Sequence, residues 1–373
     1  MHNGCPKITF ETTESSLKIL HPYKGFREDF HRVEVRKDPL LGHKSIYNAN
    51  LREKVKFFFA DCDEKLIQEM IATSAKTCPF CPDNLEKSTP KYPPDLIPEG
   101  RLRLAEAVLF PNLYPIGKYH SVIRLTNEHF LKLSQFIPSI IEHGFMLAQR
   151  FVNLVYTRDP DAVYVAVNAN YLFPAGATLV HPHLQMLVTP EPLTHLEKLI
   201  EAGEQFYTKH GTPYFLDLIS EERGLDMRYV AQEGRWHWIA AFSPIGMNEI
   251  MAIHEDTSDF GSLTGKDLAD LAYGISRVLQ MYETLGYLSF NYSLMSVRSP
   301  HVRDSYRCLI RIINRQNLYL NYRNDDYFLQ KLLHSDFIIN TPEDLAKKLR
   351  DYFYLLQEDQ NPKDWQSITN CSG

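Results

Sequence analysis

The twelve residues "LVHPHLQMLVTP", positions 179–190, place two histidines around a proline and a glutamine two positions further on. Hydrophobic and β-branched residues predominate, so we expect a β-strand here. Residues two apart on a strand point to the same face, which would set His181, His183 and Gln185 in one polar row. These side chains could bind a metal, attack a substrate or simply be buried and hydrogen-bonded, and an isolated His-x-His does not decide among the three.

A close pair of cysteines favours the metal interpretation. Of the six cysteines only Cys78 and Cys81, in "CPFC", are neighbours, and this two-residue spacing suits thiolate ligands of tetrahedral zinc. Two further ligands are needed, and the candidates are His120, His129 and one histidine of the His-x-His pair. The alternative is a redox pair, but the strand-to-helix context of such a pair is lacking. We therefore predict a zinc site.

Zinc at one histidine would leave the other free for chemistry. The free imidazole would lie among neighbours held by the metal, as a nucleophile or general base. Just upstream, "NANYLFPAGATLV" contains small residues, which allow backbone N–H groups to approach an anion. This combination indicates a substrate that carries phosphate.

Composition excludes several classes of protein. The chain has 373 residues, a formal net charge of −6 and a pI near 6.2, so it lacks the basic field of a nucleic-acid-binding protein. Apolar runs stay short of the roughly 20 residues of a membrane helix, and the first residues do not resemble a signal peptide. We expect a cytoplasmic protein of two domains, or one large double domain, without disulfides.

Periodicity predicts the same order of elements twice. Strands at 105–115 and 119–125 precede a long helix over 128–158, which contains Pro138, and strands follow at 162–170 and 181–189. After residue 190 the pattern gives a helix, three strands, a second long helix and two strands. Because no residue-level repeat is visible, duplication is an architectural hypothesis. The proline-rich stretch 76–115 is expected to form an irregular loop held by metal, and the C-terminus a loose tail.

Several segments together resemble the galactose-1-phosphate uridylyltransferase family of the histidine-triad superfamily, including its adenylyl-transferring ADP-glucose phosphorylase-like relatives. They occur in the family's order over roughly residues 30–190, and they are "RKDPLLG", "CPFC", "PPDLIPEGRLRLAEAVLFPNLYP", "HSVIRLTNEH", "NYLFPAGAT" and "HPHLQ".

The resemblance implies an α+β fold of two histidine-triad-like halves, each an antiparallel sheet with a long helix. Residues 1–190 would form the catalytic and zinc half, 191–355 a second half with a degenerate site, and 356–373 a tail. It also implies one structural zinc per chain, no organic cofactor, a homodimer, and a role in carbohydrate metabolism such as that of galactose.

The resemblance also assigns roles to residues. It makes Cys78, Cys81, His129 and His181 the zinc ligands, His183 the nucleophile that attacks the α-phosphorus of a nucleoside diphosphate sugar, and Gln185 the residue that hydrogen-bonds the phosphoryl oxygens. The implied substrate-binding residues are Arg36, Phe110, Asn112, Tyr114, Asn170, Gly176, Ala177 and Thr178. Arg52 is a further candidate for offsetting phosphate charge, with an exposed surface arginine as the equal alternative.

The chain departs from the family at several points. Leu113 stands where uridylyl-transferring members carry the aspartate of an Asn-Asp-Phe segment, while the form "NLYP" is similar to the adenylyl-transferring relatives. The second His-x-His has no counterpart, because the corresponding strand reads "RCLIRIINR", and around Lys331 the polar contacts of the hexose-phosphate segment are missing. Arg298, Arg307 and Arg311 either serve another phosphate or carboxylate ligand or lie on the solvent side of an antiparallel sheet.

The sequence therefore predicts a nucleotidyltransferase that acts through a nucleotidyl-histidine, with a nucleotide sugar and a phosphate-bearing acceptor as partners. The alternatives are an adenylyl-transferring phosphorylase of ADP-sugars or dinucleoside polyphosphates, a histidine-triad hydrolase, and a non-catalytic protein that senses a nucleotide.

Overall fold

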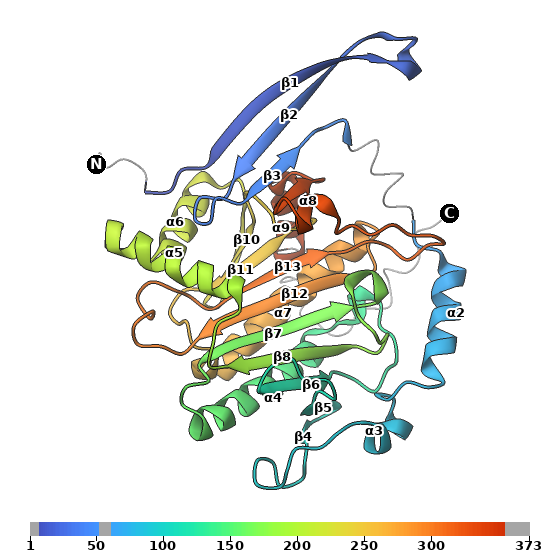
Figure 1. Cartoon of the computed structure of the whole chain (residues 1–373), viewed down its shortest axis with the longest axis vertical. Coiled ribbons are helices and arrows are strands. Elements are labelled where there is room, and N and C mark those ends of the chain that lie inside the picture. Colours follow the sequence, from blue (N-terminus) through green and yellow to red (C-terminus); the bar gives the residue numbers. More distant parts are fainter. Residues whose placement is uncertain (1–6, 52–60, 355–373) are drawn as a thin grey trace.

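The core of the protein is one large antiparallel sheet (Figure 1). The structure, a computed structural model, describes residues 7–51 and 61–354, so Arg52 and the predicted tail at 356–373 lie outside the described residues. From edge to edge, the strands of this sheet are β4 (Leu102–Leu104), β5 (Ala107–Pro111), β6 (Tyr119–Arg124), β8 (His183–Thr189), β7 (Tyr164–Tyr171), β12 (Phe290–Val297), β13 (Leu309–Asn314), β11 (Ile250–His254), β10 (Trp236–Ala240) and β9 (Tyr229–Glu233).

The sheet consists of two halves with the same topology. Each half has three consecutive strands, a long helix and two more strands, and in each half the fourth strand lies at the centre with the fifth beside it. The central strands β7 and β12 pair antiparallel, with Val167 opposite Leu294, so the halves share one continuous sheet. The predicted α+β fold with antiparallel sheets is confirmed, and the pairing of β7 with β12 adds that the two sheets are fused.

The two long helices, α4 (Pro138–Arg158) and α7 (Gly265–Thr284), pack against each other and cover one face of the sheet. The predicted start of the first helix at residue 128 is wrong, because α4 begins at Pro138. A proline has no N–H to lose at the first helical position and its φ is already helical. The helix α7 begins with a capping box, in which Thr264 and Asp267 each accept a backbone N–H of the other.

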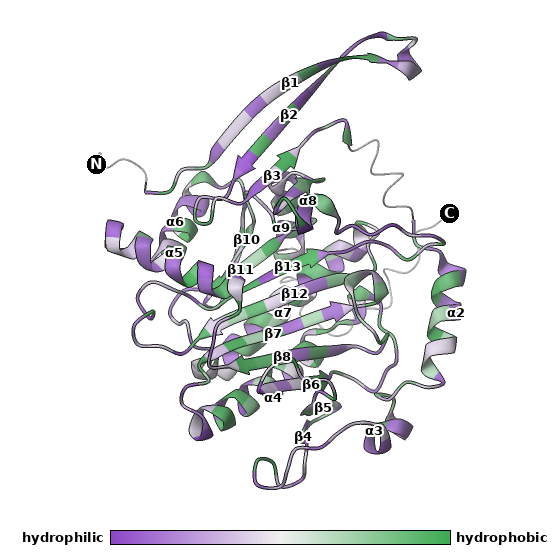
Figure 2. Ribbon diagram, in the orientation of Figure 1, coloured by the Kyte–Doolittle hydropathy of each residue, from purple (hydrophilic) through white to green (hydrophobic). Residues whose placement is uncertain are grey.

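The opposite face is covered only in part. Helices α5 (Thr194–His210) and α6 (Tyr214–Leu225) pack over the second half and form a smaller core with residues such as Phe215 and Leu309. Hydrophobic and hydrophilic residues alternate along the central strands (Figure 2), so the polar side chains of β7, β8 and β12 line the uncovered part of this face. The candidate site lies here.

A second sheet lies beside the first and carries a long hairpin that extends away from the body (Figure 1). Its strands are β1 (Glu11–His21), β2 (Arg27–Lys37), β3 (Lys44–Tyr47) and β14 (Ser335–Ile338), the last parallel to β3. The remaining elements are η1 (Pro22–Lys24), α2 (Glu64–Ala75), α3 (Pro82–Ser88), η2 (Leu133–Gln135), η3 (Phe173–Ala175), η4 (Phe260–Ser262), α8 (Phe328–Lys331) and α9 (Pro342–Tyr354). Among the described residues, no helix has the length and hydropathy needed to cross a bilayer.

The contact of α7 with the sheet leaves no space at Gly274. A Cβ at this position would lie 1.9 Å from Cζ2 of Trp238, which is fully buried in β10. We predict that Gly274→Ala lowers the free energy of unfolding by about 2 kcal/mol or more, because the ring must shift in a tightly packed core. Urea unfolding measures this. The control is Gly265→Ala at the start of the same helix, where a Cβ meets nothing within 4 Å; equal losses in both variants would contradict the prediction.

Candidate active site and metal centre

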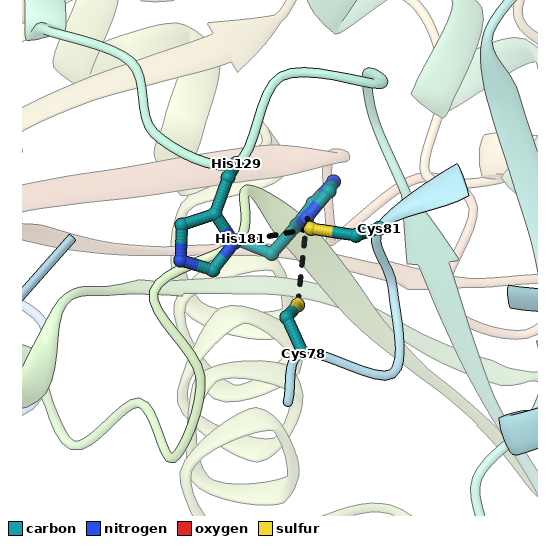
Figure 3. Close-up of side chains that lie close together, drawn as sticks. All are labelled: Cys78, Cys81, His129 and His181. Atoms are coloured by element: carbon teal, nitrogen blue, oxygen red, sulfur yellow. Dashed lines mark hydrogen bonds between the residues drawn. The ribbon is translucent and has the colours of Figure 1, made fainter. Parts of the chain in front are cut away.

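Four predicted metal ligands come together at one end of β8 (Figure 3). Cys78 and Cys81 precede α3, His129 follows β6, and His181 lies just before β8. One nitrogen or sulfur atom from each lies within 4.8 Å of all the others. Cys81 Sγ lies 3.4 Å from His129 Nδ1. Cys78 Sγ and Cys81 Sγ lie 3.6 and 3.7 Å from His181 Nδ1.

Outer hydrogen bonds orient both imidazoles for metal binding. His181 Nε2 donates to the carbonyl oxygen of Thr126 at 2.8 Å. His129 Nε2 lies 2.8 Å from Ser74 Oγ, whose own proton goes to Met70 O, so the ring donates here too. Both Nδ1 lone pairs therefore face the sulfurs, and burial lowers the pKa of His181 to about 4, which keeps its ring neutral. Two thiols and two neutral imidazoles held in this way fit zinc.

The strand begins later than the sequence predicts. His181 precedes β8, which starts at His183, so the alternation of side chains relates His183 to Gln185 but not to His181. The predicted row of three residues on one strand face is therefore wrong. Among the described residues, the carbonyl oxygen of His181 therefore makes no hydrogen bond to a neighbouring strand, and it faces the ring of His183 instead.

His183 is held in a single tautomer. Its Nδ1 lies 2.7 Å from the carbonyl oxygen of His181, which can only accept, so the ring proton is on Nδ1 and the lone pair is on Nε2. The residue is 7 % exposed and its ring meets the edge of Phe80 at a centroid distance of 5.3 Å. Burial lowers the pKa of His183, which leaves the imidazole neutral. A neutral imidazole with a free Nε2 lone pair is suited to nucleophilic attack.

A cavity of about 440 Å³ lies over the uncovered strands. Its wall includes Gln185 from β8, Asn168 and Asn170 from β7, and His120 from β6. The second half contributes Asn291 and other residues of β12 and β13. His183 is not one of the residues that line the cavity; it lies two positions before Gln185 on the same face of β8. The cavity thus presents several carboxamides close to a buried imidazole.

The predicted phosphate loop is a tight turn between β7 and β8. The backbone N–H groups of Ala175 and Ala177 both donate to the carbonyl of Leu172, at 3.0 and 3.2 Å. Gly176 has a φ of 81°, a conformation that glycine adopts without strain. The next residue but one, Thr178, is exposed. The turn is therefore compact, and its last residues are open to a ligand.

The residues of the predicted base-binding segment have mixed surroundings. Phe110 is buried against Phe80, at a centroid distance of 5.3 Å. Asn112 accepts the backbone N–H of Tyr114 at 2.8 Å and has its Nδ2 3.2 Å from His120 Nε2. The ring of Tyr114 is 81 % exposed. The segment thus runs from the core, past His120, to the surface.

Arg36 is apart from these residues. It is buried, and its guanidinium pairs with Glu34 at 2.6 Å and with Glu343 at 2.8 Å, over the ring of Phe242. It lines neither the cavity described above nor a larger neighbouring one of about 660 Å³. In this structure its charge is compensated by carboxylates of the protein.

The three arginines of the second half do not form one solvent-facing set, as one alternative expected. Arg311 is largely buried, pairs with Glu249 and lines both cavities. Arg307 is buried and donates to backbone carbonyls, among them Glu255 O at 3.0 Å. Arg298 is half exposed and lies over the ring of Tyr156. The solvent-side interpretation is therefore wrong for Arg307 and Arg311.

Sequence reasoning missed two cavity residues, His120 and Asn291. His120 was a candidate zinc ligand, but it lies in the cavity wall and contacts Gln185. Asn291 comes from the second half and contacts Asn170. The only signal for Asn291 was the alternation of polar residues in "FNYS", which places Asn291 and Ser293 on one face of a strand.

Comparison with known proteins gives the chain relatives in sequence and in structure. No protein-family model matches it. A protein of Archaeoglobus fulgidus, described as uncharacterized, is 31 % identical over 330 residues, which cover 88 % of this chain and 94 % of that protein. The chain belongs to the family of this archaeal protein. Relatedness at this level extends over nearly the whole of both chains, including both halves of the sheet.

Solved structures identify the fold. An ADP-glucose phosphorylase from Arabidopsis thaliana with bound ADP-glucose superposes with a TM-score of 0.64 and 18 % identity, covering 86 % of this chain and 99 % of that one. A uridylyltransferase mutant gives a TM-score of 0.61 and 19 % identity, covering 87 % and 99 %. The chain has the galactose-1-phosphate uridylyltransferase-like fold, and the resemblance drawn from its sequence is confirmed at the level of the fold.

The donor set predicts a zinc that stabilises the fold. We expect about one zinc per chain in the purified protein, and we expect Cys78→Ser to lose the metal and to lower the Tm by at least about 5 °C, because metal binding contributes folding free energy. Elemental analysis and thermal unfolding measure the two effects. The control is Cys62→Ser, a free cysteine outside the cluster; full zinc content in the Cys78 variant would overturn the assignment.

Proposed function

We propose that the protein is a nucleotidyltransferase that works through a covalent nucleotidyl group on His183. The observation that carries the proposal is the 2.7 Å hydrogen bond from His183 Nδ1 to the carbonyl of His181, which leaves the Nε2 lone pair available on a buried, neutral ring. The cavity lined by Gln185 and Asn170 supports it, because these side chains can hydrogen-bond phosphoryl oxygens next to such a nucleophile.

The proposed reaction has two displacements at the same phosphorus. The Nε2 lone pair attacks the α-phosphorus of a nucleoside diphosphate sugar; the N–P bond forms while the bond to the bridging oxygen breaks, and the sugar 1-phosphate leaves with the electron pair. The substituted ring carries a positive charge, which the carbonyl of His181 stabilises through Nδ1–H. An anionic oxygen of a phosphate-bearing acceptor then attacks phosphorus; the new P–O bond forms while the N–P bond breaks, and its electron pair returns to Nε2, which restores the neutral imidazole.

Other residues would bind and orient the phosphates. Gln185 follows His183 by two positions on β8 and would donate to a non-bridging oxygen. Asn170 and the turn at Gly176, Ala177 and Thr178 would face the neighbouring phosphate, with the backbone N–H and the hydroxyl of Thr178 as donors, because the N–H groups of Gly176 and Ala177 donate within the turn. Phe110, Asn112 and Tyr114 would hold the base and ribose. Arg36, paired with Glu34 and Glu343, would reach a phosphate only after those pairs break, so it would have no part in the proposed step.

Zinc would have a structural part in this site. Cys78, Cys81, His129 and His181 would hold the ion, and its coordination would join the Cys78–Cys81 loop to the segments that follow β6 and precede β8. Phe80 lies within that loop and packs against His183, so the loop keeps the nucleophilic ring in place and shields it from water. The proposal assigns this chemistry to the first half, residues up to 190, with the second half, 191–355, as a partner without a nucleophile of its own.

A second candidate function, adenylyl transfer, differs from the first in the base of the nucleotide. Leu113 provides no carboxylate for a uridine ribose and is 61 % exposed, and one structurally similar protein is an ADP-glucose phosphorylase. Adenylyl transfer from an ADP-sugar or a dinucleoside polyphosphate is therefore the alternative to uridylyl exchange between sugar phosphates in carbohydrate metabolism. A hydrolase, with water as the acceptor, would use the same first displacement.

The covalent step gives a direct test. Incubation with UDP-glucose or ADP-glucose labelled in the α-phosphate should leave label on the wild-type protein that is labile in acid and stable in base, as expected for a phosphorus–nitrogen bond to histidine. His183→Ala should carry none, because the attacking nitrogen is gone. Absence of label from both nucleotide sugars would reject the proposal.

The same labelled protein identifies the acceptor. Chasing with inorganic phosphate, a panel of sugar phosphates or buffer alone separates phosphorylase, transferase and hydrolase by the compound that releases the label. His237→Phe serves as a control, because it removes another buried imidazole, hydrogen-bonded to Glu255 at 2.9 Å in the second half; we expect this variant to be labelled like the wild type.

A further inference from the structure

Two side-chain carboxamides of the cavity have fixed orientations. A carboxamide has an oxygen that accepts and an NH₂ that donates, and by itself it can present either to a ligand. Gln185 and Asn170 both line the cavity. In each, the carboxamide oxygen accepts a hydrogen bond from another side chain, and this bond determines the direction of the NH₂ group.

For Gln185, the network begins at a backbone N–H. The N–H of Ile116 can only donate, and it lies 3.2 Å from His120 Nδ1, so Nδ1 is the acceptor and the ring proton is on Nε2. His120 Nε2 therefore donates to Gln185 Oε1 at 3.1 Å. Asn112 Nδ2, 3.2 Å from the same Nε2, finds no lone pair there. The NH₂ of Gln185 is left facing away from His120.

For Asn170, the network begins in the second half. A guanidinium can only donate, and Arg315, held by two contacts to Asp325, donates to Asn291 Oδ1 at 2.6 Å. The NH₂ of Asn291 then donates to Asn170 Oδ1 at 2.7 Å and to the carbonyl of Ala175, in the phosphate turn, at 2.9 Å. The oxygen of Asn170 is thereby engaged, and its NH₂ is left free.

The two networks have the same consequence. Within the described part of the chain, neither the NH₂ of Gln185 nor that of Asn170 has a hydrogen-bond partner, while both residues line the cavity. An unpaired donor next to a cavity favours an anion, which accepts without offering a proton. A carboxamide turned the other way would present its oxygen to a phosphate and repel it.

We propose that His120 and Asn291 are positioning residues that hold Gln185 and Asn170 as pure hydrogen-bond donors and so make this cavity selective for the phosphate groups of a nucleotide. The inference rests on the proposed function. It also involves the second half in the site, because Asn291 and Arg315 orient a residue and a turn of the first half. Neither positioning residue touches the reacting atoms.

The test compares the affinity for a nucleoside diphosphate with that for its nucleoside. Calorimetric titration of ADP and adenosine, and of UDP and uridine, gives for each protein the ratio of the affinity for the diphosphate to the affinity for the nucleoside. In His120→Phe and Asn291→Leu we expect the ratio to fall at least about fivefold, because each carboxamide becomes free to turn its oxygen toward the phosphates. A purely structural role would weaken both ligands equally, and an unchanged ratio would overturn the inference.

Two further variants separate positioning from packing. His120→Gln keeps an N–H near the place of Nε2 and should recover most of the ratio. In a Gln185→Leu background, His120→Phe should lower the affinity ratio by less than about twofold, because the carboxamide that His120 orients is gone. Equal decreases of the ratio in both backgrounds would contradict the inference. His237→Phe, the same substitution at a buried imidazole away from the cavity, should leave the ratio unchanged.

This binding test does not depend on transfer. If the wild-type protein takes no label from nucleotide sugars, the proposed function fails while the affinity ratios still decide the inference. If label forms but the affinity ratios do not change in the variants, the proposed transfer is supported and the positioning roles of His120 and Asn291 are rejected. If both the proposed function and the inference are correct, label should form more slowly in the His120 and Asn291 variants than in the wild type. This difference should remain at saturating substrate.

Discussion

The antiparallel pairing of β7 with β12 is the constraint on which the rest of the molecule depends. It joins two five-strand halves into one sheet, so that α4 and α7 must lie side by side on one face. Its register sets Asn170 opposite Asn291. Residues 121 positions apart in the chain thus meet as cross-strand neighbours, close enough for the hydrogen bond that links them. A register shift of one residue in either strand would turn the asparagine of that strand toward the helical face of the sheet.

A second constraint is the cluster of Cys78, Cys81, His129 and His181, which acts on the candidate nucleophile indirectly. The Cys-Pro-Phe-Cys loop has little regular structure before α3, and its two cysteines lie beside His129, which follows β6, and His181, which precedes β8. Through Phe80 the loop packs on His183, and through His181 the cluster fixes the carbonyl that sets the tautomer of that ring. The same residue, His181, therefore contributes a side chain to the cluster and a main-chain oxygen to the imidazole.

How much the sequence predicts depends on whether a feature is local. The long helices α4 and α7 follow from periodicity, since each has a buried and a less buried side, and the four cluster residues follow from the family resemblance of several short segments. The hairpin β1–β2 has no such signal, because nearly all of β1 is exposed on both faces. The start of α4 is predicted too early because hydrophobic spacing continues before Pro138, where the chain forms only a 3₁₀ turn. Contacts such as that of Arg36 with Glu343, 307 positions away, have no local signal at all.

The two halves share a topology but differ in the chemistry of equivalent strands. On β8 the polar residues are His183 and Gln185, whose functional groups remain available to the cavity or to its edge; on β13 the corresponding polar residue is Arg311, whose charge is matched by Glu249 within the protein. A buried, compensated ion pair gives a rigid wall but no reactive group. The second half also contributes Asn291 and Arg315, whose hydrogen bonds end on the first half. The two halves of one topology thus differ in what they supply: the first has an imidazole with a free lone pair, and the second has side chains whose hydrogen bonds hold its surroundings.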